Sequence, residues 1–125
     1  MKNQIDMGLP EPSQPFAWAI SSGEFLFTTH GPVLADGRIL QGSTADQAHL
    51  TFQHFQSAAK AAGGSMDDYV QLQIFLTDRA DVAVVDEIYR LYFRPPYPNR
   101  ATVIVAGLVV PEMNIEVTGI ARIVR

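Results

Sequence analysis

A single apolar stripe with helical spacing runs between two turn signals and predicts a long helix near the middle of the chain. Its members recur every three or four residues: Ala48, Thr51, Phe52, Phe55, Ala58, Ala59 and Ala62. Thr44 followed by Gln47 matches a capping box at its start, and Gly63-Gly64 ends it where a left-handed residue is favoured. The alanines toward the end of the stripe allow the helix to pack closely on another layer.

The next segment, residues 69–76, alternates strictly and predicts a strand. The apolar set, which we expect to face the helices, is Val70, Leu72, Ile74 and Leu76. The polar and aromatic set on the other face is Tyr69, Gln71, Gln73 and Phe75. This second set is typical of a hydrated interface between subunits.

A second amphipathic helix is expected over residues 79–93, with Asp78 or Asp81 as its cap. Its buried stripe should be Val82, Val85, Ile88, Tyr89 and Tyr92. The following residues 95–98, Pro-Pro-Tyr-Pro, cannot continue a helix and predict an extended linker. Two strands then close the chain, at about 101–106 and 114–123.

Turn signals divide the N-terminal part of the chain. Residues 1–15 contain three prolines and predict an extended arm. Strands are expected at 16–20 and 24–29, on either side of the turn Ser21-Ser22-Gly23. Within residues 32–40, Asp36-Gly37 favours a hairpin, because both central positions of a type I′ turn need positive φ.

These segments follow the order β-β-β-α-β-α-β-β and predict one α+β domain over residues 1–125. We expect a single mixed sheet of about six strands with two helices on one face. Two helices can cover only one face, and Val103, Ile104 and Val105 place apolar side chains on both faces of their strand. An exposed apolar sheet face is an association surface, so we expect a homo-oligomer.

Composition excludes several classes of protein. The net charge of -4, without clustered Lys and Arg, argues against a nucleic-acid partner. No cysteine is present, which excludes disulfides and cysteine-based zinc sites. The N-terminus does not resemble a signal peptide, and no apolar run approaches the ~18 residues that a membrane helix needs. We therefore expect a cytoplasmic protein with no membrane partner.

Arg100 is the first candidate for chemistry, because it follows the rigid linker and opens a strand of small and apolar residues. Its planar guanidinium can pair with both oxygens of a carboxylate. Glu116 alternates with Ile115 and Val117, which points it, together with Thr118, away from the helices. Two interpretations stay open: Arg100 binds a substrate carboxylate, or it forms an ion pair with Glu116 that joins their strands.

The three histidines do not form a predicted metal site. His49 and His54 are five residues apart on one helix, which places them on different sides, and His30 lies at the end of a strand. Zinc needs three or four converging ligands. We expect surface or boundary histidines and no metal.

Three stretches together resemble one family, the RidA/YjgF reactive-intermediate deaminases, from Phe16 to the C-terminus. They are AAGGSMDDYVQLQIFLTDRADVAVVDEIYRLYF, PNRATVIVAGL and NIEVTGIARIVR. The resemblance implies a chorismate-mutase-like fold and a homotrimer with a barrel-like interior and sites in the clefts between subunits. It also implies hydrolysis of 2-imino or 2-enamino acids to 2-oxo acids and ammonia, without a metal or organic cofactor.

The resemblance also implies roles for individual residues. Arg100 matches the arginine that binds the substrate carboxylate, and Glu116 matches the acid that positions the attacking water or its proton. Phe16 stands where many members have a pocket tyrosine, and Thr102 stands where a backbone group contacts the substrate. Thr29-His30-Gly31 replaces the usual Ser-Gly-Gln, which implies that His30 and Gly31 lie beside the substrate.

Other functions fit the same fold. They are a non-catalytic trimer that binds or senses a small carboxylate, another acid-processing enzyme, and an RNA-cleaving protein. The acidic net charge argues against the last of these.

Overall fold

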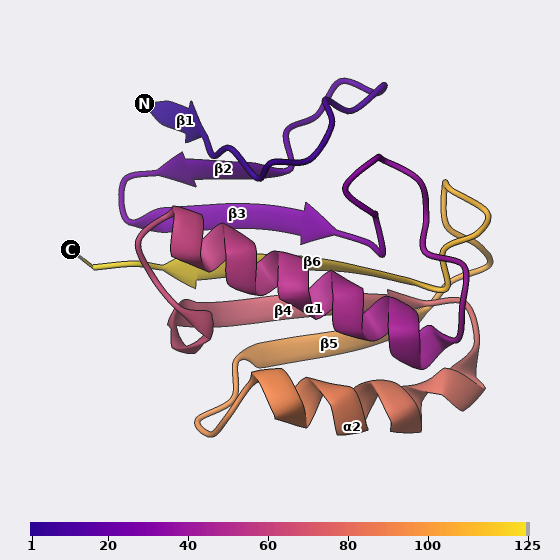
Figure 1. The fold of residues 1–125 in the computed structure, drawn as a ribbon. Coiled ribbons are helices and arrows are strands. Elements are labelled where there is room, and N and C mark those ends of the chain that lie inside the picture. The colour runs from indigo at the N-terminus through magenta and orange to yellow at the C-terminus, as the bar shows by residue number, and fades with distance from the viewer. Residues whose placement is uncertain (125) are drawn as a thin grey trace.

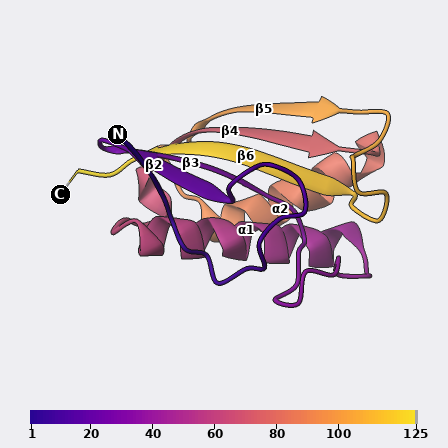
Figure 2. The ribbon, with the colours of Figure 1, turned by 90° about the horizontal axis from the view of Figure 1, so that it is seen from above.

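Two α-helices lie on the same face of one six-stranded sheet in the computed structural model, which describes residues 1–124 (Figures 1 and 2). The strands are β1 (Lys2–Gln4), β2 (Ala19–Ser22), β3 (Phe25–His30), β4 (Tyr69–Leu76), β5 (Asn99–Ile104) and β6 (Ile115–Arg122). The helices are α1 (Thr44–Ala61) and α2 (Val82–Tyr92), with short 3₁₀ turns η1 (Met66–Asp68) and η2 (Arg79–Asp81). The predicted fold class is confirmed.

The sheet is mixed, and its last strand lies near its centre. The strand order is β1-β2-β3-β6-β4-β5. β4 and β5 are parallel and are joined through α2, whereas every other neighbouring pair is antiparallel. β4 therefore separates β5, which carries Arg100, from β6, which carries Glu116.

The first strands differ from the predicted ones. The N-terminal arm contributes β1, which pairs with β2 through the register Lys2↔Ser22. The predicted strand at 16–20 begins only at Ala19. The hairpin expected around Asp36-Gly37 is a turn closed by one isolated bridge, Val33↔Ile39. Gly37 has a positive φ of 90°, as predicted, but Asp36 does not have the positive φ that a type I′ turn needs.

The ends of α1 bear out one prediction and correct another. Gly63 has φ 89°, and the Gly64 N–H donates to the Ala59 carbonyl at 2.8 Å, as in a Schellman motif. The predicted capping box is wrong, because Ser43 is the cap and accepts from the Asp46 N–H. Gln47 is buried instead, and its side-chain amide hydrogen-bonds three backbone groups in two loops, those of Leu40, Glu112 and Asn114.

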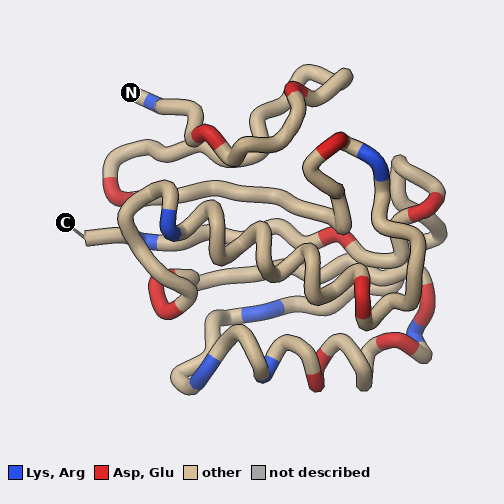
Figure 3. Tube along the Cα trace, in the orientation of Figure 1, with Lys and Arg blue, Asp and Glu red and all other residues tan. Residues whose placement is uncertain are grey.

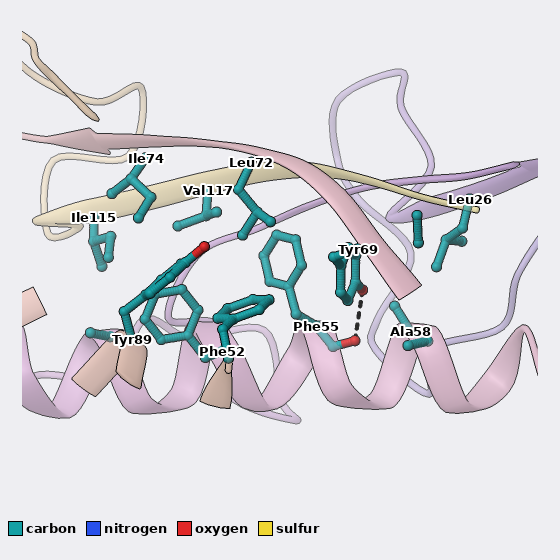
Figure 4. Packing of buried hydrophobic residues seen from close by; sticks show 14 of the residues in the cluster. Leu26, Phe52, Phe55, Ala58, Tyr69, Leu72, Ile74, Tyr89, Ile115 and Val117 are labelled. Atoms are coloured by element: carbon teal, nitrogen blue, oxygen red, sulfur yellow. Dashed lines mark hydrogen bonds between the residues drawn. The ribbon is translucent and has the colours of Figure 1, made fainter. Parts of the chain in front are cut away.

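The core lies between the helices and the sheet (Figure 4). Phe52 and Phe55 of α1 pack under Leu72, and the Tyr69 hydroxyl donates to the Phe55 carbonyl at 2.7 Å. A register shift between Tyr69 and Gln71 turns Tyr69 inward and leaves Val70 49% exposed, so the predicted faces of these two residues are wrong. From Leu72 onward the predicted alternation is confirmed.

No element of the described chain covers the face of the sheet opposite the helices. Phe25 and Phe27 are each 44% exposed there, beside the polar side chains of Gln73 and Thr118. In residues 1–124, no helix has the length and apolar character needed to cross a membrane.

Candidate functional site

A cavity of about 630 Å³ opens where the end of β3 and the start of β6 meet three loops. The loops supply residues 10–18, 31–39 and 109–113. The proline-rich first loop is fixed by the Trp18 indole N–H, which donates to the Pro10 carbonyl at 2.9 Å. We call this space the Glu116 cavity.

Glu116 reaches this cavity from the face of the sheet that the helices leave open. It pairs across the sheet with Phe75 of β4, and burial raises the pKa of its carboxyl group. Within residues 1–124, no cationic side chain forms an ion pair with it. The carboxylate is therefore available to a water molecule or a ligand.

Phe16 and Gly31 line the same cavity as Glu116. Phe16 packs edge-on against Trp18, with ring centroids 5.1 Å apart. Gly31 lies against Met113, and a Cβ atom at Gly31 would come within 2.2 Å of the Met113 terminal methyl group. A larger residue at position 31 would have to displace Met113 from the cavity wall.

Arg100 lies on the other face of the sheet, at a smaller pocket of about 280 Å³ that Tyr97 also lines. Its guanidinium forms an ion pair with Asp86 of α2, and its Nε donates to the Thr102 hydroxyl at 3.0 Å. The guanidinium carbon also lies 4.6 Å from the centroid of the Tyr89 ring. These three contacts fix the guanidinium at the edge strand β5.

Arg100 and Glu116 cannot form an ion pair within one chain. Arg100 is opposite Leu72, whose side chain is fully buried beneath the helices, whereas Glu116 is opposite Phe75 on the open face. Their strands are not adjacent either, because β4 lies between them. The predicted interpretation of a strand-joining ion pair is therefore wrong.

The structure thus divides the predicted site residues between two places. Phe16, Gly31 and Glu116 meet in the Glu116 cavity, while Arg100 and Thr102 lie together on the opposite face. Within one chain, these two groups of residues do not meet.

His30 lies behind the cavity wall instead of in it. It is 1% exposed, because it belongs to the inward-facing set of β3, so the expectation of a surface or boundary histidine is wrong for this residue. The Thr28 hydroxyl donates to the Trp18 carbonyl, which leaves its oxygen to accept from His30 Nε2–H. Burial, with a contribution from His54, lowers the pKa of His30 to about 3. The ring therefore supports the wall and does not reach a ligand in the cavity.

Sequence reasoning missed two residues at these places. Trp18 lines the cavity and stacks on the His30 ring with centroids 6.2 Å apart. Asp86 is the partner of Arg100. A signal for Asp86 existed, since its spacing of four from Val82 and three from Tyr89 places a carboxylate beside the apolar stripe of α2.

The arrangement gives no indication of a metal centre. Across residues 1–124, no three His, Asp or Glu side chains are grouped so that they could hold a metal ion. The chemistry that the two places offer is one fixed guanidinium, one partly buried carboxylate and a largely apolar cavity.

Known proteins resemble this chain over most of its length. A RutC family protein from Pyrococcus horikoshii is 33% identical over 90% of both chains. A 2-iminobutanoate/2-iminopropanoate deaminase from Dermatophagoides farinae is 27% identical over 79% of both chains. The crystal structure of Escherichia coli TdcF with bound serine superposes with a TM-score of 0.87, at 29% identity, and covers 96% of this chain and 98% of that one.

The family model described as Endoribonuclease L-PSP matches residues 8–123, which is almost all of the sheet and both helices. With the fold and these relatives, that match shows that the chain belongs to the endoribonuclease L-PSP family, which is also called the YjgF/RidA family.

Proposed function

We propose that this protein hydrolyses 2-imino and 2-enamino acids to 2-oxo acids and ammonia at sites shared between two copies of the chain. The observation that carries the proposal is the separation of Arg100 and Glu116 onto opposite faces of the sheet. A small substrate can contact both residues only if one copy supplies Arg100 and another supplies Glu116. A single copy therefore contains no complete site.

The open sheet face supports association of copies. Phe25 and Phe27 would remain half-exposed on a monomer, next to hydrogen-bonding side chains that suit a hydrated interface. A closed ring of three copies would cover all three such faces and form three equivalent sites. We therefore propose a homotrimer whose sheets face a common interior.

The proposed chemistry needs only groups that the chain has. Arg100 would hold the substrate carboxylate through its planar fork of donors. The Glu116 carboxylate would orient a water molecule and take its proton as the water oxygen bonds to the imine carbon. Glu116 then returns this proton to the nitrogen of the resulting carbinolamine, and ammonia leaves as the hydroxyl group gives its proton to Glu116 and becomes the carbonyl of the 2-oxo acid. Because an iminium carbon is already electrophilic, orientation of the water contributes more than strong activation would.

Two relatives support the choice of substrate class. The Dermatophagoides farinae protein is named a 2-iminobutanoate/2-iminopropanoate deaminase, and the Escherichia coli neighbour binds serine, a small amino acid. Both names concern molecules with a carboxylate and a nitrogen on the neighbouring carbon.

RNA cleavage, which the family description names, has less support. The chain carries nine Lys and Arg against thirteen Asp and Glu, and Figure 3 shows the basic positions scattered over the trace. Arg38, Arg94 and Arg122 are each already paired with a carboxylate. A groove that follows a phosphate backbone needs unpaired cations in a row.

The test is direct. An amino-acid oxidase generates 2-iminobutanoate in the presence of the protein, and the release of 2-oxobutanoate is compared with its release without the protein. A rate above the spontaneous one supports the deaminase. A folded protein that binds 2-oxobutanoate but does not accelerate its formation would instead be a carboxylate-binding protein.

A further inference from the structure

The wall of the Glu116 cavity is largely apolar. Its aromatic and aliphatic members come from all three loops: Phe16, Trp18, Val33, Ile39, Val109, Val110 and Met113. The charged members among the described residues are Glu11 and Glu116, both acidic. A ligand group that enters this space meets hydrocarbon surface and negative charge.

From this wall we propose a substrate class: 2-imino acids with an uncharged apolar side chain of about four non-hydrogen atoms or more, such as those formed from leucine, methionine or phenylalanine. This inference rests on the proposed function and deepens it. The substrate side chain occupies the cavity, its imine carbon lies at Glu116, and its carboxylate points to Arg100 of a second copy.

The size of the cavity argues for a large side chain. Its volume of about 630 Å³ lies within the range of pockets that enclose whole small molecules. A methyl side chain would leave most of the apolar wall in contact with water. Each additional methylene that reaches the wall removes hydrocarbon surface from water and stabilises the bound state.

The charge of the cavity argues against acidic side chains. A second carboxylate on the substrate would lie near Glu11 and Glu116, with no cation among the described lining residues to offset the repulsion. Discrimination against an acidic side chain therefore comes from the same wall that favours an apolar one.

The aromatic part of the wall is held in place before a ligand arrives. Trp18 donates to the Pro10 carbonyl, stacks on the buried His30 ring and receives the edge of Phe16 at an interplanar angle of 82°. His54 fixes a second part of the wall, because its Nε2 hydrogen-bonds the Val33 carbonyl at 2.7 Å. A wall fixed in this way loses little conformational freedom when a ligand binds.

The kinetic test uses a panel of imino acids generated in situ from alanine, leucine, phenylalanine and aspartate by amino-acid oxidases. The measured quantity is kcat/KM, with spontaneous hydrolysis subtracted. We expect a gain of about fourfold for each methylene buried, or tens of fold from the alanine to the leucine compound. The aspartate compound should be hydrolysed more slowly than the alanine compound. A flat profile, or a preference for the acidic compound, overturns the inference.

Substitutions in the wall of the Glu116 cavity test whether this wall causes the preference for large apolar side chains. Phe16→Ala and Val110→Ala should lower the ratio of leucine-derived to alanine-derived kcat/KM by about fivefold or more. Leu91→Ala is the matched control, because Leu91 is 72% exposed on α2 and lines neither the Glu116 cavity nor the Arg100 pocket. An unchanged ratio in both wall variants contradicts the inference.

A binding measurement separates this inference from the proposed function. Trp18 is the single tryptophan of the chain, so its fluorescence reports on the cavity wall. Titration with 4-methyl-2-oxopentanoate, pyruvate and oxaloacetate should give the tightest binding for the first. If no imino acid is hydrolysed but this order holds, the proposed function fails and the ligand class stands. If hydrolysis occurs and the titrations show no order, the ligand class fails alone.

Discussion

Arg100 and Glu116 point to opposite faces of the sheet from strands that flank the same neighbour, β4. Arg100 is held on the helix side by Asp86, Thr102 and the Tyr89 ring. Glu116 lies on the open side at the mouth of an apolar cavity. This separation makes association of copies a requirement of the proposed mechanism and not only a way to cover apolar surface.

Substitution of Arg100 should reduce turnover far more than stability. Arg100→Ala leaves the substrate carboxylate without a partner, which should cost about 2–5 kcal/mol in transition-state binding, or roughly 30-fold to several thousand-fold in kcat/KM. Arg100→Lys should recover little, because an ammonium group cannot form two parallel hydrogen bonds. Imine hydrolysis, melting temperature and oligomeric mass should be measured together. Normal turnover by a folded Arg100→Ala protein would refute the ligand role.

Asp86 should act through Arg100. Asp86→Ala removes the ion pair and should raise KM by about tenfold with a smaller change in kcat, because the guanidinium is no longer held in one orientation. Asp86→Asn keeps an oxygen that accepts from Arg100 and should recover most of the loss. Glu87→Ala, an exposed neighbour on the same helix, is the control. Equal losses in the alanine and asparagine variants would argue that Asp86 contributes only charge.

The pH dependence of turnover should report Glu116. Burial raises the pKa of this carboxyl above its ordinary value of 4.5, and the proposed role requires the ionised form. Activity should therefore fall as the pH is lowered through a pKa above that value. Glu116→Gln should lower kcat and remove this acid limb. An acid limb that persists in the glutamine variant belongs to another group.

Stability should fall in mild acid because of His30. Its pKa is about 3 in the folded chain against 6.5 ordinarily, so below pH 6.5 the unfolded chain binds more protons. The free energy of unfolding should decrease by about 1.4 kcal/mol per pH unit from this residue, or about 2 kcal/mol between pH 7 and pH 5. Urea unfolding of His30→Phe should show a correspondingly weaker pH dependence. Parallel curves for the two proteins would contradict this assignment.

Regular alternation made part of this site predictable. β6 keeps its pattern from Ile115 to Arg122, and Glu116 lies on the face that its neighbours predict. The sequence did not predict the face of the sheet on which the Arg100 side chain lies. β5 has small or apolar residues on both faces, and its register is set by its pairing with β4.

Two other errors have local causes. The register shift after Tyr69 exchanges the faces of Tyr69 and Val70. A periodic sequence pattern does not indicate where a strand has one irregular position. His30 lies at a position where the alternation of β3 allows burial, although the polarity of the ring argues for the surface. Its Nε2 hydrogen-bonds Thr28, whereas its Nδ1 is buried without a hydrogen-bond partner among the described residues.

Complementation between two inactive variants tests the shared site most directly. Arg100→Ala and Glu116→Gln are prepared separately, confirmed to have little activity, and then co-expressed so that mixed oligomers form. If each site takes Arg100 from one copy and Glu116 from another, random mixing should restore about one quarter of the wild-type sites. If mixed oligomers form and activity stays at the level of the separate variants, the two residues do not act in a site shared between copies, and the proposed mechanism is wrong.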